Sequence, residues 1–417
     1  MIIKSLCSLV VFLILQNTHG QIATIRFTNK SETVRENESI VIKRTVIEKK
    51  TGSLPNNKAI LLLQENKIII PSQLDDSNLD GNWDELAFQV TIPSKATLAI
   101  TLKIVSKDSM PNFEKKTQAY MGVSRNKDGD FKYVKNEIRP KDHIAQSRPM
   151  LYQFEGVGWE NDKVGFRSYF DSRNGKDIFG KTTSQLVLDS VGRPGKDYHE
   201  LSDWGMDILK VGNSLGAGAL AIAKDTVLYR LGGTKTATYT QISSGPVRSI
   251  IQLNYTGWQI ENALYNVTEI ITIWAGNYYY KSSVVITGEK LVGNITSGLV
   301  TLKNIENNKI TFSPTKNTEC IYSFTKQSEH HDLLGMGILY TKKNRISILD
   351  IPKKENPKVI GSTYGVVFKT KLDTPLEFYF FGGWEKSSSL FGNEKGFKSY
   401  IELEAEKIFK PMKILVN

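Results

Sequence analysis

Alternation of apolar and polar residues is the feature that most constrains what this chain can fold into. In its first hundred residues the alternation recurs in short segments separated by turn-forming residues such as Gly52 and Gly81. A period of two places successive side chains on opposite faces, which is typical of β-strands. The strands are expected at residues 22–27, 39–42, 59–63, 85–92 and 97–105. We therefore predict a sandwich-like β-domain over residues 21–110.

A second and larger region is predicted over residues 111–417. Residues 107–150 are rich in turn signals and are expected to form a connector or a long excursion. Longer alternating segments follow, at 226–231, 234–242, 247–255, 267–274, 278–286, 297–302, 309–312, 338–340, 346–349, 363–369 and 376–381. The pattern predicts an all-β chain whose large antiparallel β-sandwich is similar to a mutarotase-like supersandwich. One helix is expected, at residues 394–409, capped by Asn393 and ended before Pro411.

The first twenty residues have the pattern of a cleavable signal peptide. Lys4 gives a positive start, residues 6–15 form a short apolar core, and Thr18 and Gly20 suit a cleavage site. The apolar run is too short to span a bilayer. Cys7 lies at the start of the apolar core and not just after a small residue at its end, so a lipid anchor is not expected. We expect an exported protein without a membrane anchor, placed in the periplasm, with secretion as the alternative.

The cysteine content limits the disulfides that can form, and the net charge limits the binding partners that are expected. Cys320 is the only cysteine after residue 20, so no intramolecular disulfide is expected, and its alternating segment indicates a buried strand. The chain has 54 Lys and Arg against 43 Asp and Glu, a net charge of +11 without a basic block. This excess favours an anionic partner. Nucleic acid is not expected, because no basic stripe or binding motif is present. An acidic oligosaccharide fits better.

Functional residue types are densest between residues 155 and 210. In a strand near 164–170, Arg167 and Tyr169 would share one face, because their separation is two. A guanidinium can bind a sugar carboxylate and a phenol can exchange a proton. The alternative is a buried salt-bridge network, in which Arg167 or Arg173 pairs with Asp171 or Asp177.

Histidines offer proton-transfer groups. His199 lies inside the dense region and His143 in the loop before it, and imidazole exchanges protons near neutral pH. His330 and His331 are the weaker candidates. No pair of histidine and carboxylate has the spacing of a metal site.

One loop resembles a calcium site. Asp76, Asn78, Asp80 and Asp84 match the start of an EF-hand-type loop, but Ala87 stands where a bidentate Glu is needed. A polar turn between strands is the favoured interpretation, with a structural Ca²⁺ as the alternative. The glycine-rich stretch 212–218 precedes another strand-like run, so a nucleotide site is not expected.

Several motifs resemble a known family. The stretches 159–167, 177–181, 198–207, 75–85 and 245–248 resemble, in the same order, an exported bacterial β-protein family found among polysaccharide-degradation enzymes. The resemblance implies the activity of an ulvan oligosaccharide dehydratase. Such an enzyme removes water from the saturated uronic acid at the non-reducing end and leaves a 4,5-unsaturated uronate.

This chemistry needs a cation, a base and an acid. The cation neutralises charge that develops on the carboxylate when the C5 proton is removed, and the acid protonates the leaving C4 hydroxyl. We assign Arg167, or Arg173, as the cation and His199 with His143 as base and acid, with Tyr169 as the alternative proton donor. Substrate contacts are assigned to the stacking walls Trp159 and Trp204 and to Arg173, Glu160, Lys181 and Arg230. No cofactor is required.

Three other functions stay open from the sequence. A polysaccharide lyase uses the same elimination with a sugar alkoxide as the leaving group. A non-catalytic carbohydrate-binding module would carry exposed aromatic residues without converging His, Arg and Tyr. A mutarotase-like epimerase would pair a histidine with a carboxylate base.

Overall fold

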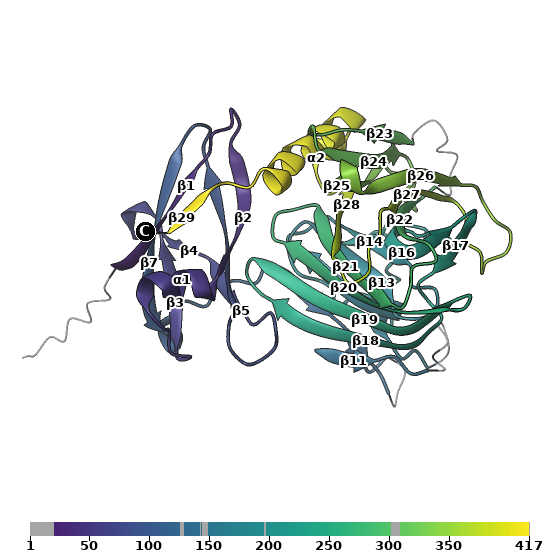
Figure 1. Cartoon of the computed structure of the whole chain (residues 1–417), viewed down its shortest axis with the longest axis horizontal. Helices are drawn as coiled ribbons and strands as arrows, with labels where there is room; N and C mark the ends of the chain where they lie inside the picture. The colour runs from purple at the N-terminus through teal and green to yellow at the C-terminus, as the bar shows by residue number, and fades with distance from the viewer. Residues whose placement is uncertain are drawn as a thin grey trace, which may run out of the picture.

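A computed structural model describes residues 21–125, 129–141, 143, 149–195, 197–301 and 309–416. The predicted signal peptide, residues 1–20, lies outside the described residues. Figure 1 shows a smaller β-unit beside a larger one. No helix in the described residues combines the length and the apolar character needed to cross a membrane.

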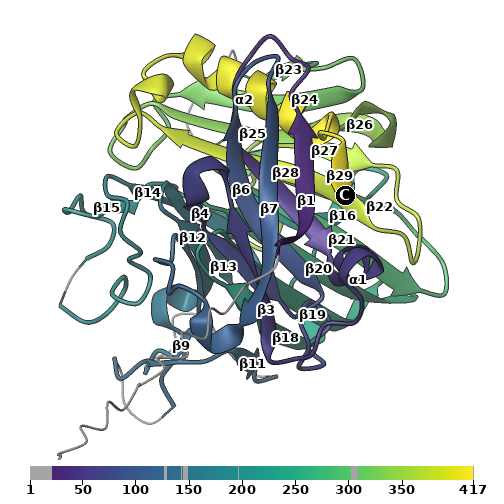
Figure 2. The same cartoon turned by 90° about the vertical axis from the view of Figure 1, so that its left-hand side faces the viewer.

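The smaller unit is a pair of antiparallel sheets around its own core (Figure 2). One sheet has the strand order β29 (Ile414–Val416), β1 (Gln21–Thr28), β7 (Thr97–Ser106), β3 (Lys58–Leu63) and β4 (Ile69–Ile70). The other has the order β2 (Arg35–Lys43), β6 (Glu85–Ile92) and β5 (Ser72–Asp75). Phe27 and Phe88 meet edge to face between the sheets, with 6.0 Å between ring centroids. Because β29 pairs with β1, the two ends of the described chain lie in the same unit.

The larger unit is built on a long antiparallel sheet. Its order is β11 (Asn136–Ile138), β18 (Thr234–Ser244), β19 (Arg248–Ile260), β20 (Ala263–Trp274), β21 (Tyr279–Gly288), β28 (Leu376–Trp384), β25 (Leu334–Thr341), β24 (Thr318–Thr325) and β23 (Ile310–Phe312). Tight turns join β18 to β21 in a meander.

Two further sheets cover this long sheet. The first has the order β15 (Gly205–Asp207), β14 (Lys176–Lys181), β13 (Val164–Tyr169), β12 (Gly156–Asn161) and β8 (Thr117–Tyr120). The second has the order β17 (Val227–Arg230), β16 (Ala217–Lys224), β22 (Asn294–Val300), β27 (Thr363–Phe368) and β26 (Arg345–Ile351). A small ribbon pairs β10 (Lys132–Tyr133) with β9 (Gly122–Val123).

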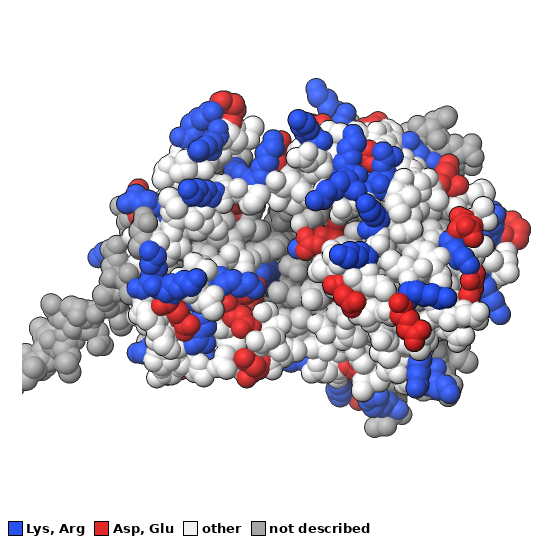
Figure 3. Space-filling view, in the orientation of Figure 1, with Lys and Arg blue, Asp and Glu red and all other residues white. Residues whose placement is uncertain are grey.

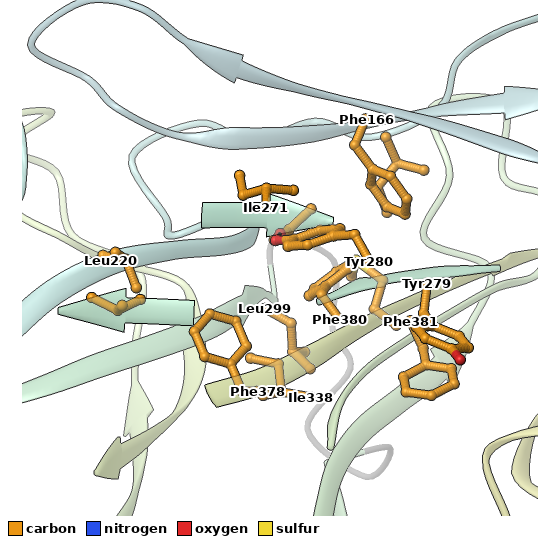
Figure 4. Packing of buried hydrophobic residues seen from close by; sticks show 14 of the residues in the cluster. Phe166, Leu220, Ile271, Tyr279, Tyr280, Leu299, Ile338, Phe378, Phe380 and Phe381 are labelled. Carbon is orange, nitrogen blue, oxygen red and sulfur yellow. Dashed lines mark hydrogen bonds between the residues drawn. The ribbon is translucent and has the colours of Figure 1, made fainter. Parts of the chain in front are cut away.

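Aromatic and branched side chains fill the space between these layers, as Figure 4 shows. Phe166 of β13 packs edge to face against Tyr280 of β21 at 4.9 Å, and Phe380 of β28 stacks on Tyr280 at 5.6 Å. Burial of this apolar area is the main stabilising term of the fold. Since the core takes one face of β13, the opposite face is left for polar side chains.

The observed architecture confirms the predicted all-β antiparallel sandwich with a smaller N-terminal β-unit and a C-terminal helix. Helix α2 (Glu394–Phe409) has Asn393 as its N-cap, whose side chain accepts a hydrogen bond from the Gly396 amide. Helix α1 (Arg44–Thr51) was not predicted. It buries only Ile47 and has no side-chain N-cap, so it lacks the usual sequence signals.

An ion-pair group joins the two units. Arg248 at the start of β19 lies 2.6 Å from Asp75 and 2.6 Å from Glu85, which end β5 and begin β6. These residues belong to two of the motifs, 75–85 and 245–248. The motifs therefore meet in space and have a structural role at the junction.

Candidate functional site

A cavity of about 890 Å³ opens beside the sheet that contains β13 and β14. Its lining combines cationic, phenolic, imidazole and carboxylate groups, from Arg167, Arg173, Arg193, Tyr169, Tyr198, His199, Glu155 and Asp197. The volume lies in the range of about 300–1,000 Å³ that is common for ligand pockets. The dense region found in the sequence therefore converges on one cavity.

Strand β13 supplies the floor of the cavity. Arg167 and Tyr169 lie on one face, and the Arg167 Nη2 group donates to the Tyr169 hydroxyl at 3.1 Å. Phe166 points to the opposite face and into the core. Arg167 is paired across the ladder with Asp177 of β14. The predicted shared face of Arg167 and Tyr169 is confirmed.

Arg167 is nevertheless fully engaged within the protein. Its Nε and Nη2 donate to Asp177 Oδ2 at 3.1 and 2.7 Å, and Nη2 also reaches Asp207 Oδ2 at 2.7 Å. Its Nη1 donates to the Phe154 carbonyl and to the Tyr198 hydroxyl. The residue is 2% exposed. A guanidinium has five N–H donors, so Arg167 has no donor left for a substrate carboxylate. Its assignment as the neutralising cation is wrong, and the alternative buried salt-bridge network is confirmed.

Asp177 and Asp207 form a buried carboxyl pair beneath the cavity. Arg167 Nη2 touches one oxygen of each, and Asp207 is hydrogen bonded to Asp177. Burial and the adjacent Asp177 raise the pKa of Asp207 well above its usual value. Asp207 therefore keeps its proton to a higher pH than a free carboxyl group does, beside the Arg167 cation.

Arg173 presents the available cationic edge of the cavity. Its Nη2 lies 2.7 Å from Asp171 and 3.3 Å from Glu155, and its Nε also contacts Asp171. Among the described residues, Nη1 has no hydrogen-bond partner, and the side chain is 35% exposed. The predicted pairing of Arg173 with Asp171 is confirmed. A substrate carboxylate can reach Arg173 where it cannot reach Arg167.

Two proton-transfer groups face the same cavity. His199 Nδ1 lies 2.9 Å from Asp197, and His199 Nε2 lies 3.6 Å from Asp207 Oδ2. The Tyr169 hydroxyl donates to Asp177 Oδ2 at 2.8 Å. Burial raises the pKa of the Tyr169 phenol well above its usual value, so Tyr169 is neutral in the resting site. The ring of Tyr198 stacks on His199 at 4.4 Å and orients it.

His143 stands apart from this pair. Its ring packs edge to face on Tyr152, 4.9 Å away, and it is not among the described residues that line the cavity. Burial lowers its pKa, with Asp171 opposing the shift. Of the two histidines assigned as base and acid, only His199 is among the described residues that line the cavity.

Several assigned substrate contacts lie in the protein interior. Trp159 is 1% exposed and stacks on Phe166 at 6.1 Å, so the core occupies the faces proposed for a sugar. Glu160 and Lys181 form a fully buried ion pair at 2.5 Å. Their assignment to substrate binding is corrected to a structural one.

Arg230 and Trp204, which were also assigned to substrate binding, make structural contacts within the protein. Arg230 donates to backbone carbonyls of Arg173, Ser214 and Asn213. Burial lowers its pKa to about 10. Trp204 packs edge to face on Phe179 at 6.1 Å, outside the residues that line the cavity.

In the loop that resembles a calcium site, backbone amides of the loop donate hydrogen bonds to its carboxylate oxygens. Asp76 accepts hydrogen bonds from the amides of Asp80 and Gly81, and Asp84 accepts from the amides of Ser77 and Asn78. These contacts are typical of a polar turn. Within the described residues, no group of three or more His, Cys, Asp or Glu side chains is placed to hold a metal ion.

Sequence reasoning missed Arg193. It lines the cavity from a Gly- and Pro-containing loop, and its Nη2 donates to the Tyr120 hydroxyl at 3.3 Å. An arginine between Gly192 and Pro194 could have been noticed, because loops with such residues often hold functional side chains.

Comparison with known proteins shows the family to which the chain belongs. Over 96% of its length, the chain is 23% identical to "Uncharacterized protein P7" of Formosa agariphila, of which it covers 95%. Two Enterococcus faecalis structures are similar at 7% identity over 95% of this chain. They are an alpha-mannosidase (TM-score 0.44) and a protein of glycosyl hydrolase family 38 (TM-score 0.46). The chain spans about half the length of these two proteins, 46% and 47%. The model of a domain of unknown function, DUF4861, matches residues 27–414, so the chain belongs to this family.

Proposed function

We propose that this protein is a dehydratase that removes water from the uronic acid at the non-reducing end of ulvan-type oligosaccharides. The observation that carries the proposal is the cavity in which the Arg173 guanidinium, the His199 imidazole and the Tyr169 phenol converge. The motif resemblance to proteins of polysaccharide-degradation loci supports the same substrate class. The enzyme would be a carbon–oxygen lyase of the hydro-lyase type.

The reaction places three demands on the site. The C5–H bond breaks, its electron pair forms the C4=C5 double bond, and the C4–O bond breaks with its pair on the leaving oxygen. Negative charge develops on the carboxylate next to C5, and a nearby cation stabilises it in a water-poor cavity. A base takes the C5 proton, and an acid protonates the leaving oxygen to give water.

Arg173 supplies the cation, and His199 and Tyr169 between them supply the base and the acid. Arg173 keeps one nitrogen without a partner among the described residues and is 35% exposed, so it can bind the carboxylate. Asp197 orients His199, and Asp177 orients Tyr169. Arg193 adds positive charge to the same cavity.

The wider setting agrees with an anionic substrate. The net charge of +11 attracts acidic oligosaccharides. Figure 3 shows Lys and Arg mixed with Asp and Glu over one face, without a block of one sign. Selectivity would then come from the cavity itself. The predicted signal peptide would place the enzyme in the periplasm, or outside the cell.

An absorbance assay tests the elimination. The protein is incubated with oligosaccharides that end in a saturated uronic acid, and ultraviolet absorbance of the conjugated double bond is followed. We expect absorbance to rise with uronate-terminated substrates and to stay constant with neutral ones of equal length. No rise with any uronate oligosaccharide would contradict the proposal and favour a binding module.

A further inference from the structure

The Tyr169 hydroxyl has a defined hydrogen-bond arrangement in the floor of the cavity. It donates its proton to Asp177 at 2.8 Å and accepts from Arg167 at 3.1 Å. A hydroxyl has one donor and two acceptor sites, so one lone pair is left. Tyr169 also lines the cavity. The geometry suits a group that takes a proton from substrate while giving its own proton to Asp177.

Asp177 cannot pass that proton straight to water. It is 0% exposed, and Asp207, to which it is hydrogen bonded, is 1% exposed. Asp207 in turn lies 3.6 Å from Nε2 of His199. This distance slightly exceeds a hydrogen bond, as is common in catalytic sites without substrate. His199 has a side chain that is 52% exposed, so the chain of groups ends at solvent.

We propose that Asp177 and Asp207 form a buried proton relay that connects Tyr169 to His199. The inference rests on the proposed elimination and assigns which residue removes the C5 proton and which residue protonates the leaving hydroxyl. Tyr169 takes the C5 proton as its own proton moves to Asp177, and protonated His199 gives its proton to the leaving hydroxyl. Asp207, protonated at the start, then passes its proton to His199, and the proton received by Asp177 moves on to Asp207. The substrate loses one water, and the enzyme returns to its starting protonation state.

The electrostatics of the pair favour this direction. Burial holds the pKa of Tyr169 and that of Asp207 well above their usual values. A free tyrosinate is therefore costly, and a coupled transfer avoids it because the phenol never carries full charge. Arg167 contacts Tyr169, Asp177 and Asp207 together and keeps them at fixed distances. Its role is to position the relay.

Asp207→Asn tests the relay. The amide has the shape of the carboxyl group and can accept from Arg167 and donate to Asp177, so the fold should persist. The variant cannot carry a proton onward. With wild-type turnover established by the absorbance assay, rapid mixing should show a burst of one product per site in Asp207→Asn. Later turnovers should be about 100-fold slower than in the wild type.

Asp197→Asn is the matched control, because Asp197 contacts the other nitrogen of His199 but not the buried pair. It should slow the first and later turnovers alike, without a burst. Equal loss in both phases in Asp207→Asn, or wild-type kinetics, would overturn the relay. If Asp207→Asn fails to fold, the dependence of wild-type kcat on the D2O fraction decides. A curved plot of kcat against the D2O fraction indicates that two protons move in the same step and supports the relay. A straight line indicates that one proton moves and overturns the relay. Absence of product from the wild type would instead refute the proposed function.

Discussion

The guanidinium of Arg173 lies over the ring of Tyr169, with 4.2 Å between its central carbon and the ring centroid. The contact places the available cation directly above the phenol proposed to act in proton transfer. Binding a carboxylate at Arg173 would therefore bring the adjacent C–H bond towards Tyr169. This relationship leads to the first prediction.

Arg173→Gln should lower kcat more than it raises KM. The charge on the substrate carboxylate grows in the transition state, so loss of the cation costs more there than in the bound substrate. We expect kcat/KM to fall by about 100- to 1,000-fold. Arg26→Gln, at an exposed arginine of the smaller unit, should leave both parameters unchanged. An effect on KM alone would mean that Arg173 only helps binding.

His199→Ala should reduce kcat by about 100- to 10,000-fold, the range for loss of a general acid or base. The side chain is half exposed, so the thermal unfolding midpoint should change little. His330→Ala, at an exposed histidine outside the cavity lining, serves as the control and should keep wild-type activity. A near-wild-type rate for His199→Ala would refute its role.

Lys181→Met should destabilise the fold and leave the activity of folded molecules intact. Loss of the cation leaves Glu160 buried and unpaired, which costs about 3 kcal/mol of unfolding free energy. Lys95→Met removes an exposed ion pair of similar length, 2.6 Å against 2.5 Å, and should cost less than about 1 kcal/mol. Urea unfolding measures both. Equal losses of unfolding free energy in the two variants would show that burial does not determine how much an ion pair stabilises the fold.

The pH dependence of stability should report on Asp207. Its pKa is raised in the folded state, by burial and by Asp177, while Arg167 opposes the shift. Above the unfolded pKa the folded state then binds the extra proton, so stability falls as pH rises towards the folded pKa. The slope is at most about 1.4 kcal/mol per pH unit.

Comparison with Asp207→Asn isolates this slope. Tyr169, Tyr198 and His199 also surround the carboxyl, but they are present in both proteins. The unfolding free energy of the wild type should therefore fall relative to that of the variant as pH increases above 4 to 5. A constant or rising difference would show that Asp207 is ionised in the fold.

Much of the fold could be predicted from alternation, because strands with one buried face carry a period of two. Segment 85–92 coincides with β6, and segment 394–409 with α2. The central strands β12, β13 and β14 are buried along their whole lengths, so their alternation is weak. Strand β29 is three residues long and pairs with a strand nearly 400 residues away, which no local pattern reveals.

The candidate site was predicted in part. Local spacing placed Arg167 beside Tyr169, because strand geometry fixes that relation. It could not show that Asp177 and Asp207 would occupy Nε and Nη2 of Arg167, since those contacts depend on how three strands pair. Residue type also misled for Trp159, Glu160 and Lys181. Aromatic and charged residues serve equally in a core or a binding site, and burial decides between them.

The mass of the reaction product tests the central claim most directly. A uronate-terminated oligosaccharide of defined length is incubated with the protein, and the products are weighed by mass spectrometry. Dehydration predicts one product that keeps every sugar residue and is lighter by one water. Two shorter fragments, one of them unsaturated, would contradict the account and identify a polysaccharide lyase.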